Sequence, residues 1–395
     1  MPAPGLVEPD SADPGHDEPG FHPSTPFTVD DILAFLLRSG DLEAQRLVDE
    51  DFEVVSVPRR NRNLRIASQD GTGFLIKQPE PGTDGHLESL RSEAGFYALC
   101  QQDERLAGLR PLLPRWVRHD LDQGWLILEL LSGTRPLGKP SPQTSLQDAH
   151  HALGKALGLL HATFRDLDLA QNPWYQALPW ARPGILSLHR PRLASVSELS
   201  GGQRHLLRIV QEDANLLAGL SGVADAWRRE TLIHGDVKSE NVLVLPGGEI
   251  RLVDWELAQP GDPAWDLAGG LQNLLLLWIQ SMPGEASLGV AERALAAELP
   301  LAHVQVAARA FWQSYRKAVG QTESLGALEL LDDLGIRGVT FSAARLLQGA
   351  YEHGQLFDRL PSEAVMMVQM AANIFADPQA AASGLYGLTW GGDSL

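Results

Sequence analysis

The amino-acid sequence predicts an α+β protein in which a small β-rich region precedes a larger, mainly helical region. Residues 52–77 alternate apolar with polar residues between turn signals, as antiparallel strands do. Residues 86–102 carry apolar side chains at helical spacing, and two further strand-like segments lie within residues 112–131. Beyond them helical patterns continue to about residue 380, interrupted by one strand-loop-strand segment at residues 231–254.

Composition and pattern divide the chain into three parts. Residues 1–26 are rich in proline, glycine and acidic residues, and such a segment buries too little apolar surface to offset the entropy lost on ordering. They are expected to form a disordered acidic tail. Residues 27–132 should form an N-terminal lobe that begins with a helix, which Thr28 caps and Gly40 ends. Residues 133–395 should form the larger, mainly helical C-terminal lobe.

Charge and cysteine content exclude several classes of protein. The net charge of -18 opposes general binding to nucleic acid. The single cysteine, Cys100, rules out an internal disulfide framework and a thiolate metal site, and its helical apolar context predicts a buried small hydrophobe. The longest apolar run, residues 271–279, is far shorter than the roughly 20 residues of a membrane span, so no membrane contact is expected. The first residues do not resemble a secretory signal, and a cytoplasmic location is expected.

The strand-loop-strand segment carries an ordered set of polar side chains. His234, Gly235 and Asp236 follow an apolar strand, Asn241 stands five residues after the aspartate, and Asp254 ends the next hairpin. One such aspartate alone would be an ordinary turn residue. The hairpin, however, folds the two carboxylates towards each other. We expect Asp236 to accept the proton of a hydroxyl, and Asn241 and Asp254 to offer the oxygen ligands that Mg²⁺ prefers. Phosphoryl transfer requires this combination.

These motifs resemble those of a known enzyme group. The HGD sequence at residues 234–236, Asn241, the DWE sequence at residues 254–256 and the GDPAWDLA sequence at residues 261–268 are similar to the aminoglycoside phosphotransferase and choline kinase group of the protein-kinase-like superfamily. The resemblance covers about residues 50–270. It implies a two-lobed protein-kinase-like fold and the use of ATP with Mg²⁺. The GDPAWDLA sequence is expected to support the metal loop, and His234 to be a buried anchor of its own loop.

The resemblance also assigns residues in the N-terminal lobe. A kinase-like fold requires a lysine on the third strand and a helical glutamate to position it, which indicates Lys77 and Glu93, with Glu88 as the rival partner. The segment from Glu129 to Gly133 would be the hinge, where backbone groups of residues such as Glu129 and Leu131 can pair with adenine.

Two features depart from the usual pattern. The loop Pro58–Arg65 contains no glycine, although Arg59, Arg60 and Arg62 could contact phosphates, an acidic partner or only solvent. Lys238 stands two residues after Asp236, as in protein Ser/Thr kinases, where it could stabilise the phosphoryl group in transfer.

Three functions therefore stay open. The first is ATP-dependent phosphorylation of a hydroxyl on a small molecule, such as an aminoglycoside or an amino alcohol. The second is a peptide Ser/Thr kinase that modifies a precursor peptide of the lanthipeptide type. Lys238, the basic loop and the acidic tail favour it modestly, the tail as a docking site for a protein partner. The third is a pseudokinase that only binds. Substrate choice should reside in the helices beyond the motifs.

Overall fold

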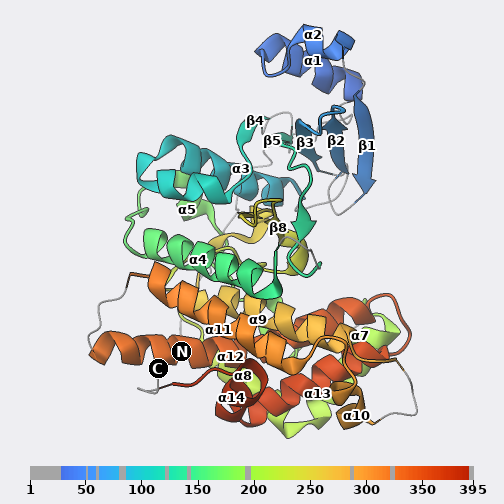
Figure 1. The fold of residues 1–395 in the computed structure, drawn as a ribbon, viewed down its shortest axis with the longest axis vertical. Helices are drawn as coiled ribbons and strands as arrows, with labels where there is room; N and C mark the ends of the chain where they lie inside the picture. Colours follow the sequence, from blue (N-terminus) through green and yellow to red (C-terminus); the bar gives the residue numbers. More distant parts are fainter. Residues whose placement is uncertain are drawn as a thin grey trace, which may run out of the picture.

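A computed structural model describes residues 28–49, 52–58, 62–79, 86–120, 124–139, 144–191, 197–284, 289–320 and 325–390. Figure 1 shows a sheet-containing part, coloured blue to teal, above a larger helical part. The predicted α+β class and the order of its two parts are confirmed. The predicted acidic tail, at residues 1–26, and the tip of the arginine-rich loop, at residues 59–61, lie outside the described residues.

A five-stranded antiparallel sheet forms the N-terminal part of the described chain, in the order β1-β2-β3-β5-β4. Its strands are β1 (Glu53–Pro58), β2 (Arg62–Ala67), β3 (Gly73–Gln78), β4 (Trp116–Asp120) and β5 (Trp125–Glu129). The antiparallel strands predicted within residues 52–77 are confirmed as β1, β2 and β3, but β5 pairs with β3, so β3 becomes the central strand. Lys77 therefore lies opposite Asn63 on β2 and Leu126 on β5, away from the sheet edges.

Three helices accompany this sheet, namely α1 (Val29–Ser39), α2 (Ala44–Asp49) and α3 (His86–Gln102). α1 begins at the predicted Thr28, whose side chain and that of Asp31 cap each other's backbone N–H groups, and ends at Gly40 in the left-handed conformation. α1 packs on one face of the sheet, against buried side chains such as Ile66 and Ile76. α3 lies below the sheet and joins the large core of the helical part.

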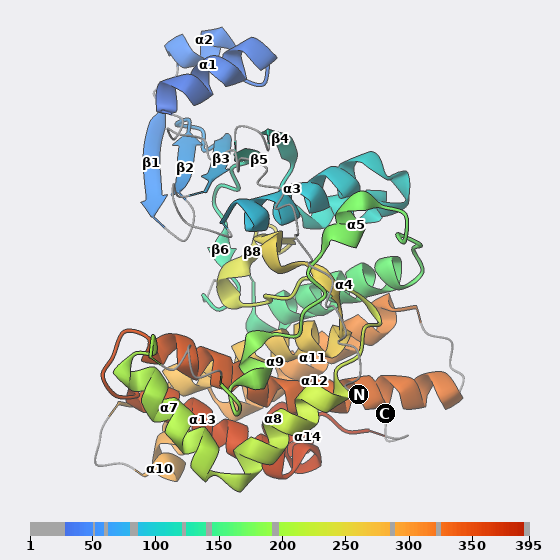
Figure 2. The ribbon, with the colours of Figure 1, turned by 180° about the vertical axis from the view of Figure 1, so that it is seen from behind.

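The C-terminal part consists of helices around small sheets. After η1 (Glu104–Leu112), the elements are β6 (Arg135–Pro136), α4 (Leu146–Arg165), α5 (Pro173–Ala177), η2 (Gly184–Ser187), α7 (Gly201–Glu212), α8 (Ala214–Ala226), β7 (Thr231–Ile233), η3 (Ser239–Asn241), β8 (Val242–Val244), β9 (Ile250–Leu252), η4 (Trp255–Leu257), β10 (Gln259–Gly261), α9 (Pro263–Gln280), α10 (Val290–Leu295), α11 (Leu301–Ala318), α12 (Leu325–Gly354), α13 (Ser362–Ala376) and α14 (Pro378–Tyr386). β6 pairs with β8 and β8 with β9, whereas β7 pairs with β10. Figure 2 shows α7 and α8 on the side opposite to α4.

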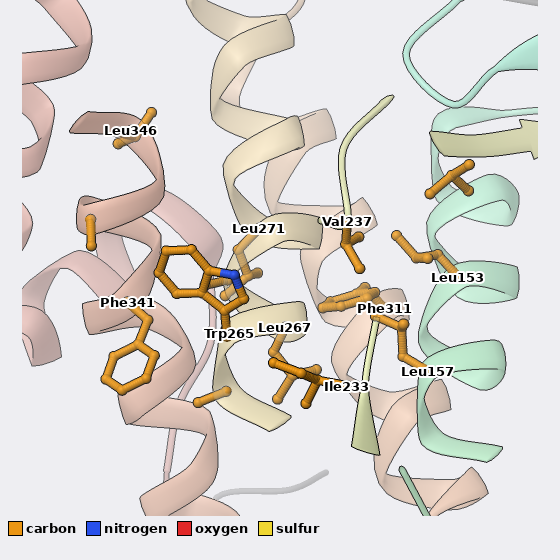
Figure 3. Packing of buried hydrophobic residues seen from close by; sticks show 14 of the residues in the cluster. Leu153, Leu157, Ile233, Val237, Trp265, Leu267, Leu271, Phe311, Phe341 and Leu346 are labelled. Carbon is orange, nitrogen blue, oxygen red and sulfur yellow. The ribbon is translucent and has the colours of Figure 1, made fainter. Parts of the chain in front are cut away.

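Helix α9 is the centre of the helical part. It begins at Asp262, whose side chain accepts the N–H of Ala264, and it is buried on nearly all sides. A helix that is apolar all round belongs in the interior, which is what the sequence LAGGLQNLLLLWI produces. Figure 3 shows Trp265 and Leu271 of α9 between Phe341 of α12 and Val237 of the loop after β7. The core thus holds the polar loop of residues 234–238 against rigid helices.

Two further observations concern membrane spans and the cysteine. Within the part of the chain that the structure describes, no helix combines the length and the apolar character that crossing a membrane requires. Cys100, the single cysteine, is buried on α3, and this burial raises the pKa of its thiol to about 12. The predicted small buried hydrophobe is confirmed.

His150 on α4 makes the stability of the fold depend on pH. Its ring is fully buried, its Nδ1 is hydrogen-bonded to the carbonyl of Leu146, and burial lowers its pKa from 6.5 to about 4. Because the unfolded chain binds this proton more tightly, the contribution of His150 to stability is present above pH 6.5 and is lost as the pH falls towards about 4. Between pH 7 and pH 5 the loss should be about 2 kcal/mol.

Chemical denaturation at both pH values, compared between the wild type and His150→Gln, measures this contribution. The variant should lose about 2 kcal/mol less than the wild type between the two pH values, whatever its absolute stability. Equal losses in the two proteins would show that His150 does not titrate on unfolding.

Candidate active site

The backbone around β7, β8 and β9 brings the predicted polar side chains together. Asp236 lies in the loop between β7 and β8, and Asp254 follows β9. The β8–β9 hairpin therefore brings the chain back to the end of β8 from which it started. Val253 donates its backbone N–H to the carbonyl of Asn241 over 3.0 Å and closes the base of this hairpin. Gly248 supplies the turn with a φ of 89°, a conformation that side chains disfavour.

Asp236 is surrounded by three polar groups. Lys238 Nζ lies 2.6 Å from its Oδ2, Asn241 Nδ2 donates to the same oxygen over 3.0 Å, and Arg345 lies 3.6 Å from its Oδ1. Although burial favours the neutral acid, the charges of Arg345 and Lys238 hold the pKa of Asp236 below its ordinary value. The carboxylate is therefore ionised at neutral pH and able to accept a hydrogen bond.

Lys77 joins the sheet to the loop after β9. Its ammonium lies 2.8 Å from both oxygens of Glu93 on α3 and 2.8 Å from Oδ1 of Asp254. The structure thus brings Glu93 to Lys77, whereas the rival Glu88 is exposed. Burial opposes the charge of Lys77, but Glu93 and Asp254 together raise its pKa above the ordinary value. The ammonium group is fixed between two carboxylates.

Asn241 and Asp254 provide the donor atoms that were predicted for Mg²⁺. The amide nitrogen of Asn241 donates to Asp236, which leaves its amide oxygen as the atom suited to a cation. Asp254 has a left-handed φ of 69° and gives Oδ1 to Lys77, so Oδ2 is a second hard oxygen. These two oxygens suit a cation that is also coordinated by phosphate oxygens, rather than one whose ligands all come from the protein. The described residues contain no group of three or more His, Cys, Asp and Glu side chains that could hold a metal ion.

His234 anchors the loop that carries Asp236. The ring is completely buried, its Nε2 is bonded to the carbonyl of Val253 over 3.0 Å, and its Nδ1 accepts the backbone N–H of Asp236. One nitrogen donates and the other accepts, which is the pattern of a neutral imidazole. Burial also lowers the pKa of His234. The predicted role as a buried anchor agrees with these contacts.

Asp266 corrects the interpretation of the GDPAWDLA sequence. Its carboxylate accepts the backbone N–H groups of His234 and Gly235 over 2.7 and 3.0 Å, together with Nε2 of His161 over 3.1 Å. The sequence was expected to support the metal loop, but Asp266 holds the loop that leads to Asp236. The physical reason is that α9 packs against β7, where the two buried N–H groups of this loop need an acceptor.

A pair of stacked rings joins α3 to the segment after Asp254. The centroids of Phe96 and Trp255 lie 3.9 Å apart with 15° between the ring planes. The indole of Trp255 also donates its N–H to the carbonyl of Leu252 and contacts His234. Glu93 and Asp254 are therefore fixed relative to each other by packing as well as by their shared ammonium partner.

The predicted hinge follows β5. Glu129 is the last residue of β5, and its carboxylate accepts the backbone N–H of Arg115 over 2.8 Å. The carbonyl of Leu131 accepts the hydroxyl of Thr134 over 3.0 Å. The connection thus leads from the sheet to β6 and α4 of the helical part, which is the position a hinge occupies.

Arg345 is the residue near Asp236 that sequence reasoning did not identify. It lies on α12, more than a hundred residues after the motif, and its side chain is 3% exposed. The available signal was an arginine within the apolar stretch FSAARLLQGAY. A cation in such a pattern needs a buried partner, but the pattern does not say which.

Comparisons with known proteins identify the family and the fold of this chain. The model of the phosphotransferase enzyme family matches residues 51–306. No curated protein matches the sequence. The structure is similar to that of the ethanolamine kinase from Plasmodium vivax, with 14% identity, 89% of this chain and 91% of that chain covered, and a TM-score of 0.50. It is also similar to the choline kinase from Streptococcus pneumoniae, with 16% identity, coverage of 88% and 98%, and a TM-score of 0.41.

The resemblance inferred from the motifs and the two-lobed kinase-like fold are both confirmed. The matched residues span more than half of the chain and include Lys77, Asp236 and Asp254. The chain therefore belongs to the phosphotransferase enzyme family.

Proposed function

We propose that the protein transfers the γ-phosphoryl group of ATP to a hydroxyl group of its substrate, with Asp236 as the base. The contact of 2.8 Å between Lys77 and Asp254 carries this proposal. It joins side chains that are 177 residues apart and that phosphoryl transfer needs at one place, an ammonium group for the phosphates and a carboxylate for the metal ion. An ordinary surface ion pair would not be buried between two lobes.

Each side chain then has a defined task. When bound with ATP, Mg²⁺ would neutralise phosphate charge, and the oxygens of Asn241 and Asp254 would hold it. Lys77 would exchange its contact with Asp254 for the nucleotide phosphates while Glu93 keeps the ammonium in place. Asp236 would orient the acceptor hydroxyl and take its proton.

Lys238 and the hinge complete the proposed site. The ammonium of Lys238, 2.6 Å from Asp236, would stabilise charge on the phosphoryl group in transfer. Backbone groups at Glu129 and Leu131 would pair with adenine, as their position between the lobes allows.

The proposed acceptor is a hydroxyl on a small molecule, such as an amino alcohol or an aminoglycoside. Membership of the family supports this acceptor. Proteins of similar fold include kinases named for choline and ethanolamine and a structure with bound kanamycin, and their names supply suitable probes.

One observation favours a second acceptor class. Lys238 contacts Asp236 directly, which is the arrangement expected of a Ser/Thr kinase that acts on peptides. A peptide kinase of the lanthipeptide type, with a protein partner, is therefore the second candidate. The third, a pseudokinase, predicts nucleotide binding without turnover.

Transfer of labelled phosphate from ATP separates these candidates. The wild type would be incubated with MgATP and choline, ethanolamine, kanamycin or serine- and threonine-containing peptides, and the products weighed by mass spectrometry. We expect one small-molecule product heavier by a phosphoryl group. Transfer to peptides alone would favour the second candidate.

Binding of the nucleotide is tested separately through Asp254→Ala. ATP should raise the melting temperature of the wild type only when magnesium is present, since the cation bridges protein and phosphates. The variant should lose this increase, whereas Asp225→Asn, at an exposed position on α8, should keep it. Stabilisation by ATP that is independent of magnesium and of Asp254 would contradict the proposed metal site.

A further inference from the structure

Arg345 lies on α12, in the last third of the chain, and contacts the loop that carries Asp236. It lies beyond residues 51–306, which the family model matches. Its side chain is 3% exposed. Burial of a guanidinium group is costly unless charge and hydrogen bonds compensate it. Two of its contacts, with the carbonyl of Val237 and the carboxylate of Asp236, lie at the loop that carries Asp236.

Contacts of the guanidinium and of its neighbour Trp265 hold the loop on both sides of Asp236. Arg345 Nη2 donates to the carbonyl of Val237 over 2.7 Å, and Nη1 donates to Oε1 of Gln348 over 3.1 Å. The group lies 5.1 Å from the ring centre of Trp265, whose indole N–H donates to the carbonyl of Gly235 over 2.9 Å. Arg345 and its stacking partner thus bind the two residues that flank Asp236 in sequence. The backbone of Asp236 cannot shift without disturbing one of these contacts.

The two oxygens of Asp236 have different surroundings. Lys238 and Asn241 both contact Oδ2, at 2.6 and 3.0 Å. Arg345 Nη1 faces Oδ1 at 3.6 Å, which is an ion-pair distance but too long for a direct hydrogen bond. Arg345 therefore attracts Oδ1 without occupying its lone pairs. Oδ1 is left as the oxygen that can accept a proton from an acceptor hydroxyl.

We propose that Arg345 is a positioning residue for Asp236, which fixes the carboxylate so that Oδ1 faces the acceptor hydroxyl. This inference rests on the proposed role of Asp236 as the base. Because a small displacement of a reacting group costs on the order of 100-fold in rate, loss of Arg345 should act mainly on kcat. It should leave the KM for ATP nearly unchanged, because Arg345 contacts neither Lys77 nor the proposed metal ligands.

Three variants test the inference, with the acceptor identified by the panel described above. Arg345→Ala should lower kcat roughly 100-fold, and Arg345→Lys should retain part of the rate because it keeps the positive charge. Guanidinium ions, added at concentrations far below those that unfold proteins, should restore much of the rate of Arg345→Ala and leave the wild type unchanged. A merely structural arginine would lower the melting temperature and the affinity for ATP together, and added guanidinium would not restore the rate.

Gln348→Leu covers the case in which Arg345→Ala does not fold. Gln348 is half-buried, and its loss removes the bond that fixes Nη1 together with an exposed bond from its amide to Glu352, so the variant should fold and show a smaller loss of kcat with the same KM for ATP. An unchanged kcat in Gln348→Leu and Arg345→Lys would overturn the inference. Asp236→Asn, measured beside them, separates this outcome from failure of the proposed function, since that failure would leave Asp236→Asn active too.

Discussion

Asp236→Asn should lower kcat for phosphoryl transfer by about 10²- to 10⁴-fold, the usual contribution of a positioned base. The amide cannot take a proton from the acceptor, although it can still bond to Asn241 and fill the same space. Affinity for MgATP should change little, because Lys77, Asn241 and Asp254 remain. Steady-state kinetics with the identified acceptor and binding of ATP by calorimetry measure the two quantities.

The matched control for this substitution is Asp225→Asn. It makes the same chemical change at an exposed position on α8, and its kcat should equal that of the wild type. A fall in kcat of less than tenfold for Asp236→Asn would contradict the assignment of Asp236 as the base. A fall accompanied by loss of ATP binding would instead indicate that Asp236 holds the metal ion.

Lys77→Met should be the most destabilising of the single changes considered. It leaves Glu93, which is 1% exposed, as a buried carboxylate near a second one at Asp254. Removal of one partner from a buried ion pair costs about 3–5 kcal/mol. Burial already raises the pKa of Glu93 despite the nearby ammonium, which shows how far its charge depends on Lys77. The free energy of unfolding from denaturant titration is the measurement.

The double variant Lys77→Met/Glu93→Gln provides the control. Without the buried negative charge, most of the lost stability should return, so the two changes should be far from additive. Neither variant should gain stability from MgATP, because both lack the ammonium that holds the phosphates. Additive losses of stability would mean that Lys77 and Glu93 are not coupled.

Much of the fold was readable from the sequence because local signals agreed with the final packing. Thr28 and Gly40 mark the ends of α1, and strand patterns located the sheet. The insertion of β5 beside β3 was not readable, since strand order depends on contacts between distant segments rather than on local pattern. The short helix α2 gave too few residues for a helical period.

The sequence likewise predicted some residues of the candidate site and not others. Asp236 and Asn241 precede the β8–β9 hairpin and Asp254 follows it, so the length of the hairpin fixes their spacing. Arg345 reaches the site only through the packing of α12 on α9, which no spacing in the sequence records. Asp266 was noticed as part of a motif, but the partner it bonds depends on how α9 packs against β7.

The stack of Phe96 on Trp255 limits how the sheet and the helical part can move apart. A rotation of the whole N-terminal part about the hinge would slide these rings over each other and lose their overlap. A rotation that leaves α3 with the helical part preserves the stack, and the sheet alone then turns. In that motion Glu93 and Asp254 would keep their relative positions, and only the ammonium of Lys77 would move away from them.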